Sequence, residues 1–283
     1  MPTSSTANPV QTYRERLPAP RLAGQVSSVW IQHVAADGVP YEHRTVPNGA
    51  TELSWELGSD LVTVSGPQRQ PIVGHLAPGS TVVGIRFRPG VAPSILGPPA
   101  SELVDQHVEV DRLWGRPALT LAERLAEAES PEGASRLLED EVFRRITDAS
   151  EPDPVVAAAI GRLQPWRPDD IGTWAAGLFL SPRQLRRRFT AALGFGPKMF
   201  QRILRFQGFL ALSQGRHGRD SGLARLARQA GYSDQSHLTR ESSELTGLTP
   251  RAFLEEMWSS CGENHDHEAS YGALRRGLLA SSR

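Results

Sequence analysis

The first part of the chain alternates hydrophobic and polar positions in short runs separated by glycine and proline. In the run at 51–57, Leu53 and Trp55 fall on one side and Glu52 on the other, because successive strand side chains point to opposite faces. Runs of this kind predict strands at Val26–Val34, Thr51–Leu57, Leu61–Val64 and Val82–Phe87. The pattern indicates a β-rich domain with one face in a hydrophobic core.

Farther along, hydrophobic positions recur every three to four residues, which is the period of an α-helix. Residues from Leu119 to Ile146 follow this period with one interruption at 130–133, so they predict a pair of helices. The hydrophobic stripe of the pair includes Leu121, Leu125, Val142 and Ile146. This stripe either covers the sheet of its own chain or pairs with a second copy across a two-fold axis.

A polar segment with two prolines, Ala149–Pro154, separates this part from a series of short helices that continues to about Met257. We therefore predict an α+β fold, in which a β-rich N-terminal domain with a following helix pair precedes an all-α domain. The predicted boundaries are 1–150 for the first domain, 151–258 for the second and 259–283 for a flexible tail.

The helical part contains an internal repeat. A pattern of five positions recurs 53 residues later, and four of the five positions hold the same residue in both copies. The corresponding residues are Leu185, Arg187, Phe189, Gly194 and Pro197 in the first copy and Leu238, Arg240, Ser242, Gly247 and Pro250 in the second. A hydrophobic turn containing alanine precedes each copy, followed by a connector that ends in a helix-capping residue. The repeating unit is therefore predicted to be a helix, a tight turn and a second helix.

Local chemistry supports this unit in both copies. Ser181 followed by Pro182 is typical of a helix start, because serine caps free N–H groups and proline needs no donor at the first position. In the second copy Gly231 supplies the turn, and Ser233 or Asp234 caps the helix. Each unit thus predicts a capped helix with polar and basic side chains on its outer side.

The segment between the two units, Pro197–Ser213, is hydrophobic over a broad face and predicts a linker helix. Packed against both units, it would hold the two capped helices roughly 34 Å apart, so that they enter successive major grooves of one duplex. In that groove arginine bonds guanine and glutamine bonds adenine. The all-α domain is thus predicted to be two helix-turn-helix units joined by a linker helix, with double-stranded DNA as partner.

Charge is segregated along the chain although the net charge is zero. Residues 1–150 carry 13 basic and 18 acidic side chains, whereas residues 151–258 carry 15 and 10. The second domain is therefore the basic one, as DNA binding requires. The alternative is a plain helical bundle with solvated arginines, but the repeat, the caps and the charge segregation together favour DNA.

The helical segment resembles the DNA-binding domain of the AraC/XylS family of bacterial transcriptional regulators. The matching residues are Trp174-Ala175, Leu180–Arg187, Phe189, Gly194 and Pro197, then Leu226-Ala227, Ala230–Arg240 and Gly247–Pro250. The resemblance implies a sequence-specific regulator with RNA polymerase as a further partner. It places the base-reading residues at Arg183, Arg186, Arg187, Gln235, Ser236 and Arg240.

Two positions depart from the pattern of this family. Phe179 stands in the turn of the first unit, where the family usually has glycine. Ser242 stands where the family has a core aromatic residue, which removes hydrophobic burial of about 2 kcal/mol. The second unit is therefore expected to be looser than the first.

Segments 45–53 and 83–90 look like the β-rich N-terminal domain found ahead of some AraC-type regulators. This resemblance implies a domain that senses a small-molecule effector or forms a homodimer, without indicating a particular ligand. Side chains suited to line a ligand pocket are Trp30, His43, Trp55, Glu56 and Arg86. The alternative is that the two tryptophans belong to the core and the other three side chains to the surface.

A cupin-like metal-dependent enzyme is the alternative from another functional class, because β-rich domains with several histidines include such enzymes. The spacing does not support it: the His-x-His pair at 265–267 falls in the tail, where both side chains are expected to be solvated, and motifs for nucleophilic catalysis or phosphate binding are missing. A single cysteine, Cys261, makes no internal disulfide. We predict no enzymatic activity, no metal and no cofactor.

The sequence also bears on location. No hydrophobic run approaches the roughly 18 residues of a membrane span, and residues 1–10 lack the hydrophobic stretch of a signal peptide. We therefore predict a cytoplasmic protein with no membrane association.

Overall fold

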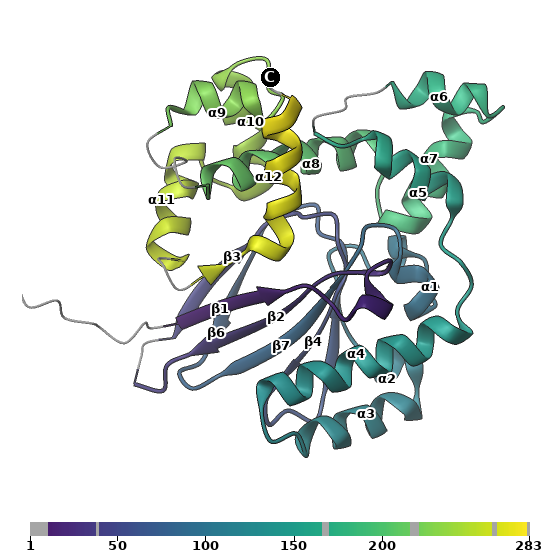
Figure 1. Cartoon of the computed structure of the whole chain (residues 1–283), viewed down its shortest axis with the longest axis vertical. Helices are drawn as coiled ribbons and strands as arrows, with labels where there is room; N and C mark the ends of the chain where they lie inside the picture. The colour runs from purple at the N-terminus through teal and green to yellow at the C-terminus, as the bar shows by residue number, and fades with distance from the viewer. Residues whose placement is uncertain (1–10, 38–39, 166–169, 216–220, 262–264, 282–283) are drawn as a thin grey trace, which may run out of the picture.

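The computed structural model describes residues 11–37, 40–165, 170–215, 221–261 and 265–281 (Figure 1). In this part of the chain a seven-stranded sheet has the order β8-β5-β4-β7-β2-β1-β9. Its strands are β1 (Gln11–Arg16), β2 (Val26–Val34), β4 (Glu52–Glu56), β5 (Val62–Ser65), β7 (Thr81–Phe87), β8 (His107–Glu109) and β9 (His265–Asp266). Neighbouring strands are antiparallel except β1 and β9, which are parallel. A separate antiparallel pair consists of β3 (Tyr41–Thr45) and β6 (Ile72–Leu76).

The four predicted strands are present as β2, β4, β5 and β7, and none of their ends differs from the prediction by more than one residue. The sequence pattern missed β1, β3, β6 and β8. In β1 the buried positions are Gln11, Tyr13 and Glu15. Because these residues are polar or amphipathic, this strand lacks the hydrophobic alternation by which the others were found.

Helices cover one face of the sheet (Figure 1). They are α1 (Ala92–Leu96), α2 (Asp111–Trp114), α3 (Arg116–Ala126) and α4 (Pro131–Asp148), with two short turns of 3-10 helix, η1 (Pro20–Leu22) and η2 (Ala100–Glu102). Leu53 and Trp55 of the sheet lie in one hydrophobic cluster with Leu121, Leu125 and Val142 of the helix pair. Full burial of each such side chain contributes about 1.5–3 kcal/mol. The predicted pair, α3 and α4, therefore covers the sheet of its own chain.

The opposite face of the sheet is polar. Alternation along the strands places Ser28 and Trp30 on this side, and the strand register sets Arg86 opposite both Ser28 and Glu52. Glu15 stands opposite Trp30 on the neighbouring strand. The polar face of the sheet consists of Tyr13, Glu15, Ser28, Trp30, Glu52 and Arg86.

The C-terminal part is the predicted all-α domain. Its helices are α5 (Pro154–Arg162), α6 (Ile171–Gly177), α7 (Pro182–Leu193), α8 (Pro197–Ser213), α9 (Leu223–Gln229), α10 (Gln235–Thr246) and α11 (Pro250–Cys261). The linker helix α8 has the predicted bounds, and its Phe200, Phe206 and Phe209 are fully buried. Units α6–α7 and α9–α10 lie toward its two ends (Figure 1). The α+β fold class is thus confirmed. No helix in the described segments is both long and hydrophobic enough to cross a membrane.

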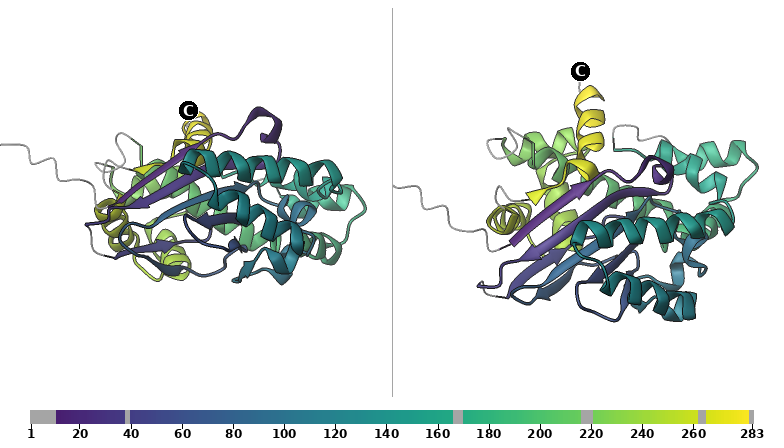
Figure 2. Two further views of the ribbon diagram at one scale, coloured as in Figure 1. Left: turned by 90° about the horizontal axis from the view of Figure 1, so that it is seen from below. Right: turned by 60° about the horizontal axis from the view of Figure 1, so that its bottom comes forward.

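The prediction of a flexible C-terminal tail is wrong for residues 265–281. Strand β9 pairs with β1 at the edge of the sheet, and α12 (Glu268–Ser281) packs against α8. Figure 2 shows α12, at the yellow end of the colour scale, rising from the edge of the sheet beside the helical domain. Tyr271, Leu274 and Leu278 have helical spacing, and Leu278 is buried in the core of the helical domain. The polar composition of the tail concealed this short hydrophobic stripe.

Candidate nucleic-acid interface

The first predicted recognition helix, α7, begins with the cap that its sequence predicts. Ser181 Oγ accepts the Gln184 N–H, and the Gln184 side chain accepts the Ser181 N–H, so the two residues satisfy each other. Leu185 and Phe189 are buried on the inner side of the helix. This fixes which side of α7 is presented outward.

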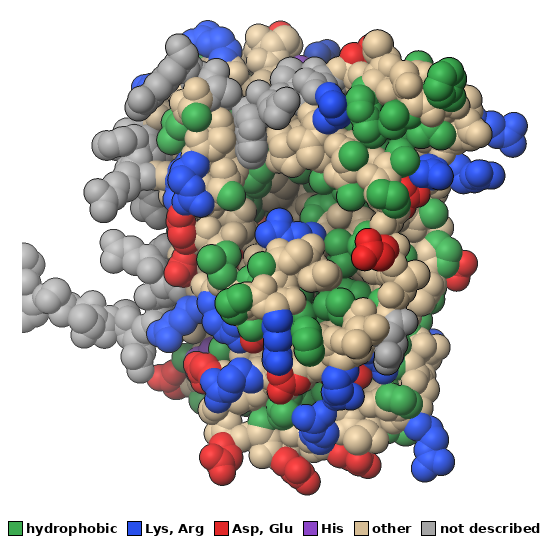
Figure 3. All heavy atoms as spheres, turned by 45° about the vertical axis from the view of Figure 1, so that its right-hand side comes forward, with side chains coloured by type: hydrophobic (Ala, Val, Ile, Leu, Met, Phe, Trp, Pro, Cys, Tyr) green, Lys and Arg blue, Asp and Glu red, His purple; other side chains and the backbone are tan. Residues whose placement is uncertain are grey.

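Three basic residues occupy the outward side. Arg183, Arg186 and Arg187 are exposed, and the salt bridges among the described residues include none of them. Arg188, by contrast, pairs with Asp153 at 3.1 Å. Figure 3 turns the side bearing α6 and α7 toward the viewer: basic side chains project at its upper right, and basic and acidic side chains are mixed over the lower half. The three arginines are therefore available to phosphates and bases.

The second recognition helix, α10, is capped by Asp234, whose carboxylate accepts the His237 N–H at 2.8 Å. This backbone hydrogen bond is the main cause that holds the pKa of Asp234 below its ordinary value. Gln235, Ser236 and Arg240 are exposed in the first turns of the helix. All six predicted base-reading residues thus lie at the surface of the two predicted helices.

The linker helix holds both recognition helices. At one end Phe200 of α8 packs against Phe189 of α7, with ring centroids 6.5 Å apart. Two and five residues farther along α8, Arg202 and Arg205 face α10: the buried carboxylate of Glu241 accepts from Arg202 at 3.1 Å and lies 3.7 Å from Arg205. Because removal of one partner would leave a buried charge unpaired, this ionic contact fixes α10 on α8.

Ser242, which replaces an expected aromatic residue, is fully buried. Its hydroxyl donates to the Leu248 carbonyl at 3.0 Å, and the Thr246 hydroxyl also bonds there, at 3.1 Å. Ser242 therefore connects the end of α10 to the following turn by a hydrogen bond. The expected looseness of the second unit stays a prediction.

Phe179 occupies the turn before α7 with φ of +58°, in the left-handed region, and is 97% exposed. A non-glycine residue there costs of order 1 kcal/mol, and the exposed ring recovers nothing by packing. We therefore expect Phe179→Gly to raise the free energy of unfolding by about 1 kcal/mol, measured by urea denaturation. Leu178→Gly is the matched control, because Leu178 has φ of −97° and gains no relief. Equal changes in the free energy of unfolding for the two substitutions would contradict backbone strain at Phe179.

Both recognition helices touch the N-terminal domain at their C-terminal ends. Gly194 ends α7 with φ of +84°, and an added Cβ would stand 2.4 Å from Val104 Cγ2, so only glycine fits this contact. At the end of α10, Arg44 of β3 donates to the Thr246 carbonyl at 3.3 Å and pairs with Glu256 at 2.8 Å. The N-terminal domain thus contacts both units directly.

A cleft of about 560 Å³ lies between α7 and η2. Its lining residues are Pro99 and Ser101 of the N-terminal domain and Arg183, Gln184, Arg186, Arg187, Thr190 and Ala191 of α7. All three exposed arginines of α7 belong to this lining. A duplex that receives α7 therefore lies close to the N-terminal domain.

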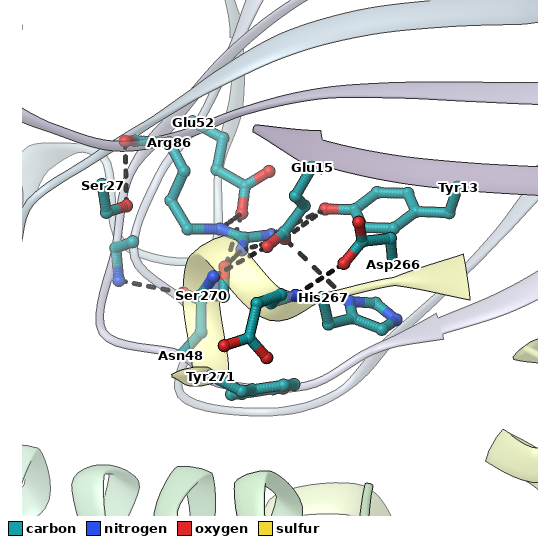
Figure 4. Close-up of polar contacts among 12 residues, drawn as sticks. Tyr13, Glu15, Ser27, Asn48, Glu52, Arg86, Asp266, His267, Ser270 and Tyr271 are labelled. Atoms are coloured by element: carbon teal, nitrogen blue, oxygen red, sulfur yellow. Dashed lines mark hydrogen bonds and ion pairs between the residues drawn. The ribbon is translucent and has the colours of Figure 1, made fainter. Parts of the chain in front are cut away.

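The polar face holds a buried ionic cluster around Arg86 (Figure 4). The guanidinium donates from Nε to Glu52 at 2.7 Å and from Nη1 to Glu15 at 2.8 Å. The tail completes the cluster: Arg86 Nη1 also donates to Ser270 Oγ at 2.6 Å, and the Ser270 N–H donates to Glu15 at 2.9 Å. Burial alone raises the pKa of Glu15, but Arg86 and Ser270 outweigh it and hold that pKa below its ordinary value.

The five predicted ligand-lining residues do not form one pocket. Trp30 and Arg86 share the polar face, but Trp55 points to the other face and lies in the hydrophobic core. Glu56 is exposed at the end of β4. His43 lies on β3 of the smaller sheet, and burial lowers its pKa. Alternation along the strands therefore separates Trp55 from Trp30.

Sequence reasoning missed five residues of the cluster, of which Glu52 lies on a predicted strand. Tyr13 and Glu15 alternate along β1, and this period of two among polar residues is a signal that could have found them. His267 and Ser270 come from the tail, and Ser270 is 255 residues away from Glu15 in the chain. No local pattern connects residues so far apart. The expectation that His265 and His267 are solvated is wrong, since both rings pack against Tyr13.

The docked tail is expected to loosen as pH falls. Burial lowers the pKa of His265 to about 4 and also lowers that of His267, so the released tail, with ordinary pKa values near 6.5, takes up more protons. Docking is therefore strongest above pH 6.5 and weakens between there and about pH 4. Arg86 also opposes protonation of His267. Glu15, 4.0 Å away, and Asp266 favour protonation, so they offset part of the lowering of the His267 pKa.

The pH dependence of tail docking can be measured by hydrogen exchange of residues 268–281 at pH 7 and 5.5, corrected for the intrinsic exchange rates at each pH. His265→Asn should reduce the pH dependence. His75→Asn, at an exposed position of β6, should leave it unchanged. Equal protection of the wild-type tail at both pH values would contradict the expectation.

Within the described residues, no three or more His, Cys, Asp or Glu side chains are grouped so that they could hold a metal ion.

Comparison with known proteins agrees with the two-part organisation. A helix-turn-helix domain family matches residues 174–256, and a domain of unknown function, DUF6597, matches residues 14–109. No curated protein matches the chain. Two crystal structures of ToxT from Vibrio cholerae are similar at low level. The unsaturated-fatty-acid-bound form is 9% identical, with a TM-score of 0.41 over 89% of this chain and 97% of that chain. A second crystal form is 11% identical, with a TM-score of 0.38 over 87% and 97%.

Two helix-turn-helix units with outward-facing polar and basic side chains, held on one linker helix, define a DNA-binding protein. More particularly, residues 174–256 are a helix-turn-helix domain of the AraC type.

Proposed function

We propose that the chain regulates transcription by binding one DNA duplex with α7 and α10 together. The residues proposed to contact bases and phosphates are Arg183, Arg186, Arg187, Gln235, Ser236 and Arg240. The observation that carries the proposal is the joint exposure of these six side chains on two capped helices that one linker helix holds. Because a single chain has both helices, a homodimer is not required for a two-part operator.

We further propose that the N-terminal domain senses a small-molecule effector. The contacts of Gly194 and Arg44 support this, because a change in the N-terminal domain acts directly on the ends of both recognition helices. The polar face is the proposed effector site, since it combines aromatic walls with a few convergent polar groups. Cytoplasmic location and contact with RNA polymerase follow from the proposed role.

Selection of duplexes from a random pool by the full chain tests the DNA proposal. We expect an enriched motif of two parts whose centres are about 10 base pairs apart, the spacing of successive major grooves. Arg187→Ala should alter one part and Arg240→Ala the other. Enrichment of no motif, or binding that is lost with salt equally for all sequences, would refute the proposal.

A further inference from the structure

The docked tail meets the polar face with groups of positive character (Figure 4). The Ser270 N–H, in the first turn of α12, donates to Glu15 Oε2 at 2.9 Å. The N-terminus of a helix carries a partial positive charge from its free N–H groups. His267 stacks on Tyr13 at 4.8 Å, with its Nδ1 4.0 Å from the Glu15 carboxylate. A backbone donor and a flat nitrogen ring thus fill the space above Glu15.

The polar face itself has an excess of negative charge. Glu15 has no exposed side-chain surface, Glu52 is 17% exposed, and both share the single guanidinium of Arg86. Arg86 therefore compensates one of two carboxylates. Such a face favours a cation over a neutral molecule and disfavours an anion. Tyr13 and Trp30, stacked with centroids 6.0 Å apart, add ring faces that attract cations.

The tail satisfies the polar face incompletely. Ser28 Oγ and Trp30 Nε1 are buried, and neither has a hydrogen-bond partner among the described residues. His267 Nε2 is also buried without a partner in that part of the chain. Unpaired buried polar atoms cost about 1–3 kcal/mol each. Release of the tail would free His267 Nε2 from its buried position, and an occupant that donated to Ser28 Oγ would compete favourably with the tail.

Displacement of the tail would reach the DNA-binding domain through α12. The Tyr271 hydroxyl bonds Gln207 of α8 at 3.1 Å, and Gln207 in turn donates to the Pro47 carbonyl at 2.8 Å. Leu278 lies so close to Gly208 of α8 that an added Cβ there would stand 3.1 Å from Leu278 Cδ1. The tail is therefore connected both to the polar face and to the helix that holds the two recognition helices.

We propose that the polar face binds a small organic cation, a primary ammonium attached to a flat ring, and that residues 267–270 occupy this site when the cation is absent. The ammonium takes the place of the Ser270 N–H at Glu15, and the ring takes the place of the His267 imidazole on Tyr13. This deepens the effector role proposed above and rests on it. The test does not involve DNA, so its failure is distinguishable from failure of the DNA proposal.

Three aromatic probes of similar size and different charge test the site on the full chain: benzylamine, benzyl alcohol and benzoate. Binding is measured by thermal shift, and release of the tail by hydrogen exchange of residues 268–281. We expect benzylamine to raise the melting temperature and to speed exchange of the tail severalfold. Benzyl alcohol and benzoate should change neither. Benzoate acting as strongly as benzylamine would overturn the proposal, and so would binding of benzylamine without faster exchange.

Two substitutions distinguish the role of the polar face from the role of the tail that occupies it. Glu15→Gln removes the charge that selects the cation and should abolish the response to benzylamine. Ser270→Ala removes a hydrogen bond of the tail from Arg86 but leaves the face intact, so benzylamine should bind roughly five- to tenfold more tightly. Ser259→Ala, on the exposed side of α11, is the matched control and should behave as wild type. No response in either the wild type or Ser270→Ala, up to the solubility of the probe, would refute the site.

Discussion

Replacing Arg86 with alanine is expected to lower the free energy of unfolding by about 3–5 kcal/mol, because two buried carboxylates lose their shared counterion. The Arg86 guanidinium lies 2.8 Å from Glu15 and 2.7 Å from Glu52, and Glu15 has no exposed side-chain surface to solvate its charge. Urea denaturation at neutral pH measures the change.

The neighbouring Arg88 provides the control for this substitution. Arg88 is exposed and donates to a single carbonyl, that of Ala23, so Arg88→Ala should cost no more than about 0.5–1.5 kcal/mol. Arg86→Met combined with Glu15→Gln and Glu52→Gln should recover much of the loss, because no charge is then left buried. A loss below about 1 kcal/mol for Arg86→Ala, the value of a surface ion pair, would contradict the buried cluster.

Arg187→Ala is expected to weaken binding to the selected operator by about 1–3 kcal/mol, or roughly five- to 150-fold. The arginine is exposed and makes no salt bridge within the described residues, so its removal should leave the stability of the fold nearly unchanged. If Arg187 contacts a phosphate rather than a base, the loss of affinity should be similar for all DNA sequences. The slope of the logarithm of the binding constant against the logarithm of the salt concentration should then become shallower by about 1. Fluorescence anisotropy at several salt concentrations measures both.

Arg251→Ala is the matched control for the operator measurement. Arg251 lies on α11 with 81% of its side chain exposed, and it pairs with Glu255 on the same helix. The same charge is removed, but outside the two recognition helices, so affinity should stay within about twofold. Equal losses for Arg187→Ala and Arg251→Ala would mean that the domain attracts DNA only through net charge.

Elements that bury one hydrophobic face could be predicted from the sequence. In β4, Leu53 and Trp55 alternate with polar residues, and in α8 the buried phenylalanines recur at helical spacing, so both elements were predicted within a residue of their bounds. Strand β1 could not be found in this way, because its inward side chains, Gln11 and Glu15 among them, are polar. They are buried only because Arg86 and the tail meet them there.

The recognition helices were predictable for a similar reason. Ser181 and Asp234 cap helices through bonds to backbone groups three residues away, so the signal is local. The residue pattern from Leu185 to Pro197 and its repetition 53 residues later can likewise be recognised in the sequence. The outward position of Arg187 follows from the inward position of Leu185 and Phe189 on the same helix.

The sequence by itself determined the strands and helices with a hydrophobic side, the repeated unit and the outward direction of its arginines, because periodicity and capping act over a few neighbouring residues. Only the tertiary structure decided that the tail docks, that Ser270 meets Glu15 across 255 residues of chain, and that Trp30 and Trp55 face opposite sides. Ion pairs and hydrogen bonds depend on distance in space, and that distance exists only after the hydrophobic faces have brought the sheet, α8 and α12 together.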